Sequence, residues 1–139
     1  MIIVDGNGMV FGRVASKISK ELMTGKEVVL VNAEKILISG SPHAIIERYK
    51  TKRDLKNKAN PDKSPRWPKV PERFVKRLIR GMLPWKKPRG KLVFSNLTVY
   101  SGIPKDIKES PVIFEECRPK NISKYISISK LCRMFGYEG

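Results

Sequence analysis

The sequence predicts an α/β fold with a mainly parallel sheet, and three observations support this prediction. "MIIV" at the N-terminus is a short apolar run. "EVVLVN" at residues 27–32 is a second one, continuously apolar from Val28 to Val31 as in strands covered on both faces. Residues 10–24 between them have the 100° periodicity of an amphipathic helix. Because a strand, a helix and a strand follow one another, we expect a right-handed parallel crossover.

The first helix is defined by its neighbours as well as by its periodicity. The glycine-rich "DGNG" after the first strand predicts a tight turn into the helix. The apolar residues of the helix share one face, while Arg13, Lys17 and Lys20 lie on the opposite face. Gly25 is expected to end the helix. This pattern predicts a helix packed on a sheet.

A second helix and a proline-rich loop are expected next. Ser41 can cap free amides and Pro42 fits the first turn, so a helix should begin there and run to about Lys58. Its first half is apolar on one side, but the same stripe continues as cations that cannot be buried unpaired, so the helix is expected to project. Residues 59–71 contain four prolines and predict an extended loop with a reach of about 40 Å.

The helix that should begin at Pro71 has two distinct faces. One face carries four cations, namely Arg73, Lys76, Arg77 and Arg80. The opposite face is apolar and is formed by Phe74, Val75, Leu78, Ile79 and Met82. Cations at i and i+4 repel each other and destabilise an isolated helix, so an external polyanion is their natural counter-charge.

The C-terminal part completes the expected sheet. "LTVY" at 97–100 predicts a third strand and "PVIFEEC" at 111–117 a fourth. Residues 127–136 predict a final helix that buries Ile128, Leu131, Cys132 and Phe135. A length of 139 residues suits one domain with one core, so residues 1–139 are expected to form a single α/β domain with a small four-stranded sheet.

Positive charge is concentrated in the middle of the chain. The formal net charge is +16, and residues 41–95 hold 17 cations and four acids, a net of +13. Such an excess places nucleic acid ahead of an anionic membrane or an acidic protein as the partner. We therefore interpret residues 48–91, here named the basic arm, as a nucleic-acid-binding helix-loop-helix extension.

The candidate RNA contacts in the basic arm are cations, tryptophans and glycines. Arginine and lysine neutralise phosphates without reading sequence. Trp67 and Trp85 either stack on unpaired bases or pack against neighbouring prolines, and Gly81 and Gly90 either let a phosphate approach or only turn the chain. The candidates are Arg48, Lys52, Arg53, Lys56, Arg66, Trp67, Arg73, Lys76, Arg77, Arg80, Gly81, Trp85, Lys86, Lys87, Arg89, Gly90 and Lys91.

The sequence gives little support for a disulfide framework, a metal site or a catalytic site. Cys117 and Cys132 are too few for a disulfide framework and lack zinc spacing, and the single His43 excludes a two-histidine metal site. No motif for acid–base or nucleophilic catalysis is present, so we expect no catalytic residue, no metal, no cofactor and no small-molecule substrate. Without a signal peptide or an apolar run of about 20 residues, we expect a soluble intracellular protein with no membrane partner.

One glycine pattern keeps an alternative open. Gly6, Gly8 and Gly12 follow the first strand as G-x-G-x-x-x-G, a relative of dinucleotide-binding loops. The second strand closes on Asn32 rather than on the acid that such sites use. The glycines either turn the chain, hold an RNA phosphate at the helix N-terminus, or serve a small nucleotide-binding enzyme.

Two motifs, one in the N-terminal half and a second one in two parts, give the sequence a family resemblance. "VDGNGMVFGRVASKISKELMTGKEVVLVNAEKILISG", "RGMLPWKKPRGK" and "LTVYSGIP" resemble the large-subunit ribosomal protein L13 family, in particular its archaeal branch. The chain departs from the family pattern in the loop "KSPRWPKVP". The motif positions that the resemblance assigns to RNA contact are Arg13, Arg80, Gly81, Lys86, Arg89 and Gly90.

The resemblance also carries expectations about fold and role. It implies a three-layer α/β/α fold, no catalysis, and a structural role in binding and stabilising folded large-subunit rRNA early in assembly. The implied partners are this rRNA and neighbouring large-subunit ribosomal proteins, and the implied location is the large subunit in the cytoplasm.

Overall fold

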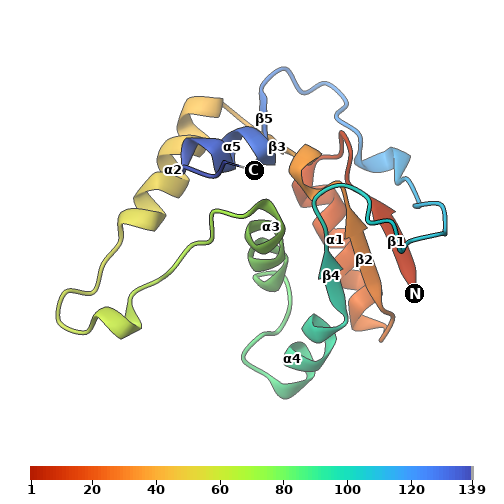
Figure 1. Ribbon diagram of the computed structural model, residues 1–139, viewed down its shortest axis with the longest axis horizontal. Coiled ribbons are helices and arrows are strands. Elements are labelled where there is room, and N and C mark those ends of the chain that lie inside the picture. Colours follow the sequence, from red (N-terminus) through yellow and green to blue (C-terminus); the bar gives the residue numbers. More distant parts are fainter. Residues whose placement is uncertain (139) are drawn as a thin grey trace.

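The computed structural model describes residues 1–138 and contains a parallel three-stranded sheet (Figure 1). Its strands are β1 (Ile2–Asp5), β2 (Val28–Val31) and β4 (Leu97–Val99), in the order β1-β2-β4. Ile2 lies opposite Val28, and Val28 lies opposite Leu97. The helix α1 (Phe11–Met23) connects β1 to β2 and packs against β2. The predicted parallel crossover is thus confirmed.

A second, antiparallel sheet was not predicted. It pairs β3 (Leu37–Ser39) with β5 (Tyr125–Ser127), so that Leu37 lies opposite Ser127. Each strand has three residues, and their pairing joins two segments that are far apart in the sequence, so no local pattern indicates it. The C-terminal segment is thereby joined to the first third of the chain.

The expected fourth strand at 111–117 is wrong. Within it, only Val112 pairs, in an isolated parallel bridge to Val4 at the free edge of β1. The chain then turns into the 3-10 helix η3 (Glu115–Cys117), in which the Cys117 N–H donates to the Phe114 carbonyl. This turn buries Cys117 and leaves both glutamates exposed, whereas a strand would place Cys117 and Glu115 on the same face. The parallel sheet therefore has three strands, not four.

The helix α2 (Pro42–Asp54) begins as predicted but ends four residues before Lys58. Ile45 and Tyr49 are buried, whereas every residue from Asp54 to Lys63 is exposed. With no surface to pack against beyond Asp54, the helical conformation is not supported by tertiary contacts.

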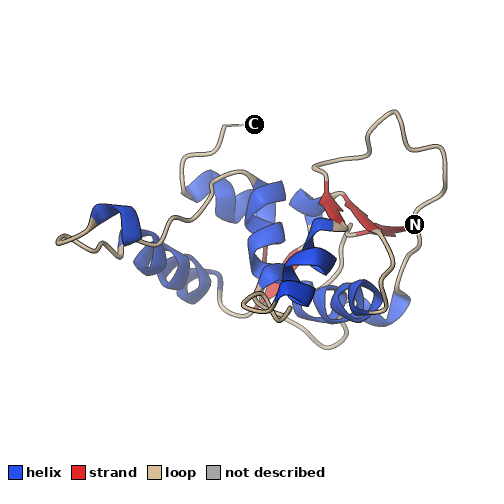
Figure 2. Ribbon diagram, turned by 90° about the horizontal axis from the view of Figure 1, so that it is seen from below, coloured by secondary structure: helices blue, strands red, loops and turns tan. Residues whose placement is uncertain are grey.

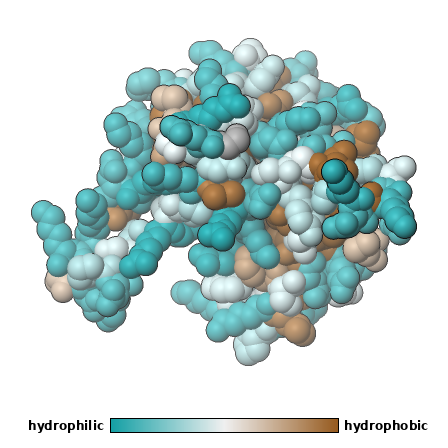
Figure 3. Space-filling model, in the orientation of Figure 1, coloured by the Kyte–Doolittle hydropathy of each residue, from teal (hydrophilic) through white to brown (hydrophobic). Residues whose placement is uncertain are grey.

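The first part of the loop after α2, up to Ser64, does not follow the predicted extended path. The Ser64 hydroxyl accepts a hydrogen bond from the Asn57 N–H at 2.8 Å, and the Asn57 side chain accepts one from Asn60 N–H. A 3-10 helix, η2 (Pro61–Lys63), also lies in this segment. The loop therefore stands out from the body and folds back to it, as Figures 1 and 2 show. Figure 3 shows that this extension is almost wholly hydrophilic.

The helix α3 (Pro71–Arg80) has the two faces that its spacing predicts. Phe74, Val75 and Ile79 are at most 1% exposed, while Met82 lies beyond the helix and is 44% exposed. The short α4 (Pro88–Ser95) was not predicted. The final helix α5 (Ile128–Met134) buries three of the four predicted apolar residues, and Phe135 is partly buried. Its cap is Ser127, whose hydroxyl accepts from the Lys130 N–H.

One hydrophobic cluster contains residues from both sheets and from all five α-helices. Figure 1 shows α3 beside β4, with α5 and α2 beyond it. Because α3 is built into this cluster on one face, its other face is held in a fixed position. Within residues 1–138, no helix combines the length and the apolar character needed to cross a bilayer.

Both cysteines are buried and unpaired. Burial raises the pKa of the Cys132 thiol to about 11 and also raises the pKa of Cys117. Because the thiolate is the reactive form, we expect neither residue of the folded protein to react with an aromatic disulfide reagent at about pH 8. In denaturing urea both thiols should react, and the released chromophore counts them. Rapid labelling of the native protein would contradict this expectation.

Candidate nucleic-acid interface

The four predicted cations of α3 lie along one groove. Arg73, Lys76, Arg77 and Arg80 line a hollow of about 270 Å³ together with Pro68 and Phe94. The spacing i, i+3, i+4 and i+7 places the four side chains on one helix face, and the buried opposite face fixes their direction. The predicted row of cations is thus part of a shaped surface.

Aromatic rings hold three of these cations in place. The Arg77 guanidinium carbon lies 4.1 Å from the centroid of Trp67, and the Arg80 carbon lies 5.0 Å from that of Trp85. The Lys76 ammonium lies 5.1 Å from the centroid of Phe94. Each such contact contributes about 0.5–1 kcal/mol at an exposed site. It also limits the rotamers of a long side chain, which lowers the entropy lost on binding.

The cations of the basic arm are not neutralised by acids. Within residues 1–138, the ion pairs involve Lys17, Lys26, His43 and Arg118 but no cation between residues 48 and 91. The one acid of α3, Glu72, instead accepts a hydrogen bond from the Ser101 N–H. Burial and the nearby charge of Arg80 both lower the pKa of Arg77. The row therefore lacks an internal counter-charge.

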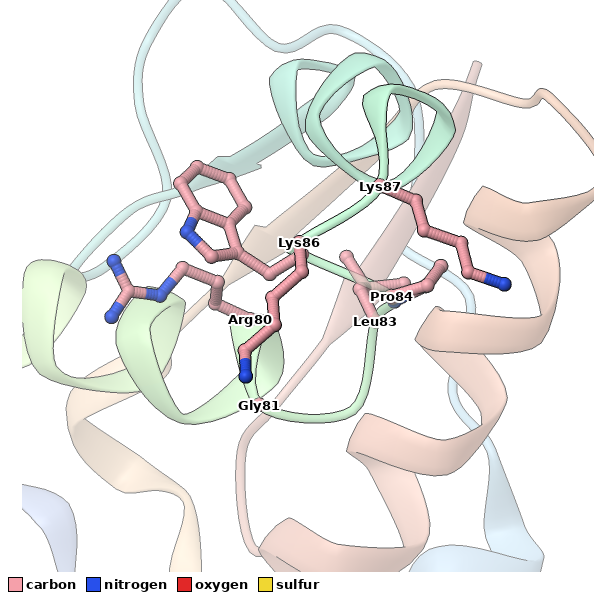
Figure 4. Close-up of a pocket in the computed structure, with 7 residues that line it drawn as sticks. Arg80, Gly81, Leu83, Pro84, Lys86 and Lys87 are labelled. Carbon is pink, nitrogen blue, oxygen red and sulfur yellow. The ribbon is translucent and has the colours of Figure 1, made fainter.

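A second groove follows the end of α3. It has a volume of about 470 Å³ and is lined by Arg80, Gly81, Leu83, Pro84, Trp85, Lys86 and Lys87. Arg80 lines both grooves, so the two hollows adjoin. Figure 4 shows the side chains of Arg80 and Lys87 extending to opposite sides. The motif "RGMLPWKKPRGK" thus forms a cationic rim around an apolar lining.

Gly90 has a packing role that the sequence left open. A Cβ added at this position would lie 2.0 Å from the Pro84 carbonyl oxygen and 2.4 Å from its carbon. The glycine is buried in the first turn of α4, directly beneath the loop that forms the second groove. Its lack of a side chain allows this loop to lie against the helix.

We expect Gly90→Ala to destabilise the protein by about 1–3 kcal/mol, the cost of overpacking a close contact. Gly81→Ala is the matched control, because Gly81 has a φ of −62° and an added Cβ would meet only the Leu78 carbonyl at 3.3 Å. Urea denaturation of the two variants measures the difference. Equal stability of the two would show that the contact with Pro84 is easily relieved.

Trp67 lies in an aromatic cluster with Tyr49 and Phe74. Its ring centroid is 5.8 Å from that of Tyr49 and 6.0 Å from that of Phe74. The Arg53 guanidinium donates to the Trp67 carbonyl at 3.0 Å, and the Lys52 ammonium lies 5.1 Å from the ring. In this structure Trp67 therefore joins α2 to α3, and two candidate cations of α2 support it.

The remaining candidates lie apart from the two grooves. Arg13 donates to the Arg118 carbonyl at 3.1 Å, and Arg89 donates to the Met23 carbonyl at 3.2 Å, so each ties two segments together. Arg48 lines a small hollow with Ser39, Gly40, Ser41, Ala44 and Ile45. Lys56, Arg66 and Lys91 are exposed.

The glycine turn offers few amides to a phosphate. The N–H groups of Gly6, Gly8 and Val10 donate to the carbonyls of Val31, Lys35 and Cys117. The Asn7 N–H donates to the Asp5 carboxylate and the Met9 N–H to the Gly6 carbonyl. Since a phosphate-binding loop needs free amides, these hydrogen bonds disfavour a phosphate within residues 6–10. Among residues 1–138, no cluster of three or more His, Cys, Asp or Glu could hold a metal ion.

Sequence reasoning missed the apolar members of the grooves. Leu83 and Pro84 lie inside the motif that the sequence singled out, but only its cations, its tryptophan and its glycines were selected. Pro68 and Phe94 line the first groove. The available signal was the position of Leu83 and Pro84 within an otherwise cationic stretch.

Comparisons with known proteins agree with these motifs. A family model described as ribosomal protein L13 matches residues 1–106. The large ribosomal subunit protein uL13 of Methanosphaera stadtmanae is 40% identical over 136 residues, covering 96% of each chain. That of Archaeoglobus fulgidus is 38% identical over 141 residues, covering 99% of this chain and 88% of the relative. That of Methanocaldococcus jannaschii is 38% identical over 137 residues, covering 98% of each. All three relatives are archaeal, and the chain belongs to the ribosomal protein L13 family.

Proposed function

We propose that this protein is a structural component of the large ribosomal subunit and that it binds and stabilises folded rRNA. The observation that carries the proposal is the unneutralised row of four cations on α3, oriented by aromatic rings and continuous with a second cationic groove. A regular row of cations without acids matches the repeating charge of an RNA backbone. The names of the relatives, which are large ribosomal subunit proteins, support the same role.

The proposed contacts fall into two groups. The primary surface consists of Arg73, Lys76, Arg77, Arg80, Gly81, Trp85, Lys86 and Lys87, which line the two grooves. The secondary contacts, which do not line either groove, are Arg13, Arg48, Lys52, Arg53, Lys56, Arg66, Trp67, Arg89, Gly90 and Lys91. In this division, Trp67, Arg89 and Gly90 act mainly by holding the surface in shape.

We further propose that residues 1–139 form one domain, in which residues 48–91 are the RNA-binding segment. The fold is proposed to have the three layers that the family resemblance implies, with α1 and α3 as the outer layers. Both of these helices pack on the parallel sheet. Neighbouring large-subunit proteins are the remaining partners, and binding belongs to an early step of subunit assembly in the cytoplasm.

The role proposed here is architectural rather than catalytic. The family is that of a ribosomal protein, and the grooves supply cations and apolar surface rather than a nucleophile or a general base. Such a surface can neutralise phosphates brought close together by RNA folding. The expected effect is stabilisation of RNA tertiary structure.

The salt dependence of binding to large-subunit rRNA tests the proposal. If six to ten phosphates are contacted, the association constant should fall by about 10³- to 10⁵-fold between 50 and 200 mM salt. Filter binding to transcribed rRNA segments measures it, and small-subunit rRNA provides the control. A nearly flat response to salt, or failure of the protein to co-sediment with large subunits, would contradict it.

A further inference from the structure

We propose that the groove between α3 and α4 receives one unpaired RNA base, while the adjoining α3 groove holds the neighbouring phosphates. This inference rests on the proposed function and names the RNA feature that the surface recognises. It concerns Arg80, Gly81, Leu83, Pro84, Trp85, Lys86 and Lys87, which line the larger groove.

The size and lining of the groove fit a flat, apolar group. Its volume of about 470 Å³ lies in the range of about 300–1,000 Å³ that is typical of small-ligand sites. Leu83 is 6% exposed, and Figure 4 shows Leu83 and Pro84 together between the side chains of Lys86 and Lys87. Phosphates bound on a row of cations do not require such an apolar hollow. A base attached to those phosphates would fill it.

Trp85 supplies a stacking surface. Its side chain remains 36% exposed although the Phe94 ring lies 4.9 Å away at 80° and the Arg80 guanidinium lies 5.0 Å from its centroid. These two contacts hold the indole in place without covering it. Aromatic rings and guanidinium planes are the groups on which unpaired RNA bases stack.

The charges select RNA over an acidic peptide. Three cations, Arg80, Lys86 and Lys87, line this groove, and Arg80 also belongs to the four-cation row of the neighbouring groove. A base and its flanking phosphates can occupy both hollows at once, because the apolar part and the anionic part of a nucleotide are adjacent. A peptide would need an aromatic residue followed by several acids at matching intervals.

The test compares two RNA hairpins of equal charge. One carries a single bulged adenosine, and the other carries an abasic residue at the same bulge, so that only the base differs. The protein should bind the adenosine bulge about 5- to 150-fold more tightly, the value of one base–aromatic stack. This ratio should stay constant between 50 and 200 mM salt, while both affinities fall because of the phosphate contacts.

Three variants separate stacking from charge. Trp85→Ala should abolish the preference for the adenosine bulge and leave the salt dependence of binding unchanged. Trp85→Phe, which keeps a ring, should retain part of the preference. The double variant Lys86→Gln/Lys87→Gln should weaken both hairpins by the same factor. In a Trp67→Phe background, the emission of the remaining Trp85 should be quenched by the adenosine bulge and not by the abasic one.

Several results would overturn the inference. Equal affinity of the two hairpins for the unaltered protein would exclude a base site, and strongly salt-dependent binding of both would leave the proposed rRNA binding intact. If Trp85→Ala lowered the affinity for both hairpins by the same factor, Trp85 would have only a structural role. Displacement of the bulged hairpin by an acidic, tyrosine-containing peptide at equal charge would identify a protein ligand instead. Absence of binding to either hairpin would reject the base site and the proposed function together.

Discussion

Replacing the four α3 cations together, as Arg73→Gln/Lys76→Gln/Arg77→Gln/Arg80→Gln, is expected to weaken rRNA binding by about 10³-fold at 0.1 M salt. Each phosphate contact contributes about 0.7–0.9 to the slope of the logarithm of the association constant against the logarithm of the salt concentration. At 0.1 M salt each contact is therefore worth about sixfold, and four contacts are worth about 10³-fold. The slope itself should decrease by about 3. Filter binding at several salt concentrations measures both quantities.

A charge-matched control is available outside the basic arm. Lys105, Lys108, Lys120 and Lys124 are exposed and lie in the C-terminal third of the sequence. Replacing these four lysines by glutamine removes the same net charge, yet binding should change by less than about tenfold, because only the long-range field is altered. Similar losses in the two quadruple variants would mean that net charge, rather than the α3 groove, determines affinity. The thermal unfolding of both variants checks that the fold is retained.

Phe74→Ala is expected to lower the free energy of unfolding by about 3–5 kcal/mol, which is a large part of the stability of a domain of this size. The Phe74 side chain is 1% exposed and lies between the hydrophobic core and the aromatic cluster of Tyr49 and Trp67. It belongs to the hydrophobic core, and its ring also lies 5.1 Å from Tyr49 and 6.0 Å from Trp67. Its removal would leave a cavity beneath α3 and loosen the attachment of α2. Urea denaturation followed by circular dichroism measures the change.

The control for this variant is Phe74→Leu, which keeps most of the volume and should cost less than about 1.5 kcal/mol. Trp67→Ala provides a second comparison, because Trp67 is only partly buried and its loss should be smaller than that of Phe74. If Phe74→Ala and Trp67→Ala were equally mild, α3 would not depend on the core for its position. The fixed position of the α3 cations would then require another explanation.

The sequence predicted those elements whose patterns are local. The helix at Pro71 was identified from its spacing alone, since four cations and the buried Phe74, Val75 and Ile79 fall on opposite faces. The first helix was recognised from its 100° periodicity, and the first and second strands were recognised as continuous apolar runs.

The elements that sequence reasoning missed depend on distant partners. The strands β3 and β5 have three residues each and exist because the two segments meet in space. The loop after α2 was expected to be extended, but the side chains of Asn57 and Ser64 fold it back through contacts that no composition rule includes. The close approach of Gly90 to Pro84 likewise depends on how α4 packs against the preceding loop.

The candidate site shows the same division. The charges of the interface could be predicted from the sequence, because cations at i, i+3, i+4 and i+7 are a pattern within one helix. The two grooves could not, since they require Pro68, Leu83, Pro84 and Phe94 to be brought beside the cations. Leu83 in particular is 6% exposed, and nothing in the sequence distinguishes it from an ordinary core leucine.

The antiparallel pairing of β3 with β5 has a consequence for how the newly made protein matures. Leu37 pairs with Ser127, and Ile128, Leu131 and Cys132 of α5 are fully buried. Translation proceeds at about 5–20 residues per second, so most of the polypeptide exists for several seconds before these closing residues are made. The helix α3 packs against α5, so it cannot acquire its full set of contacts until residues 128–134 have been translated.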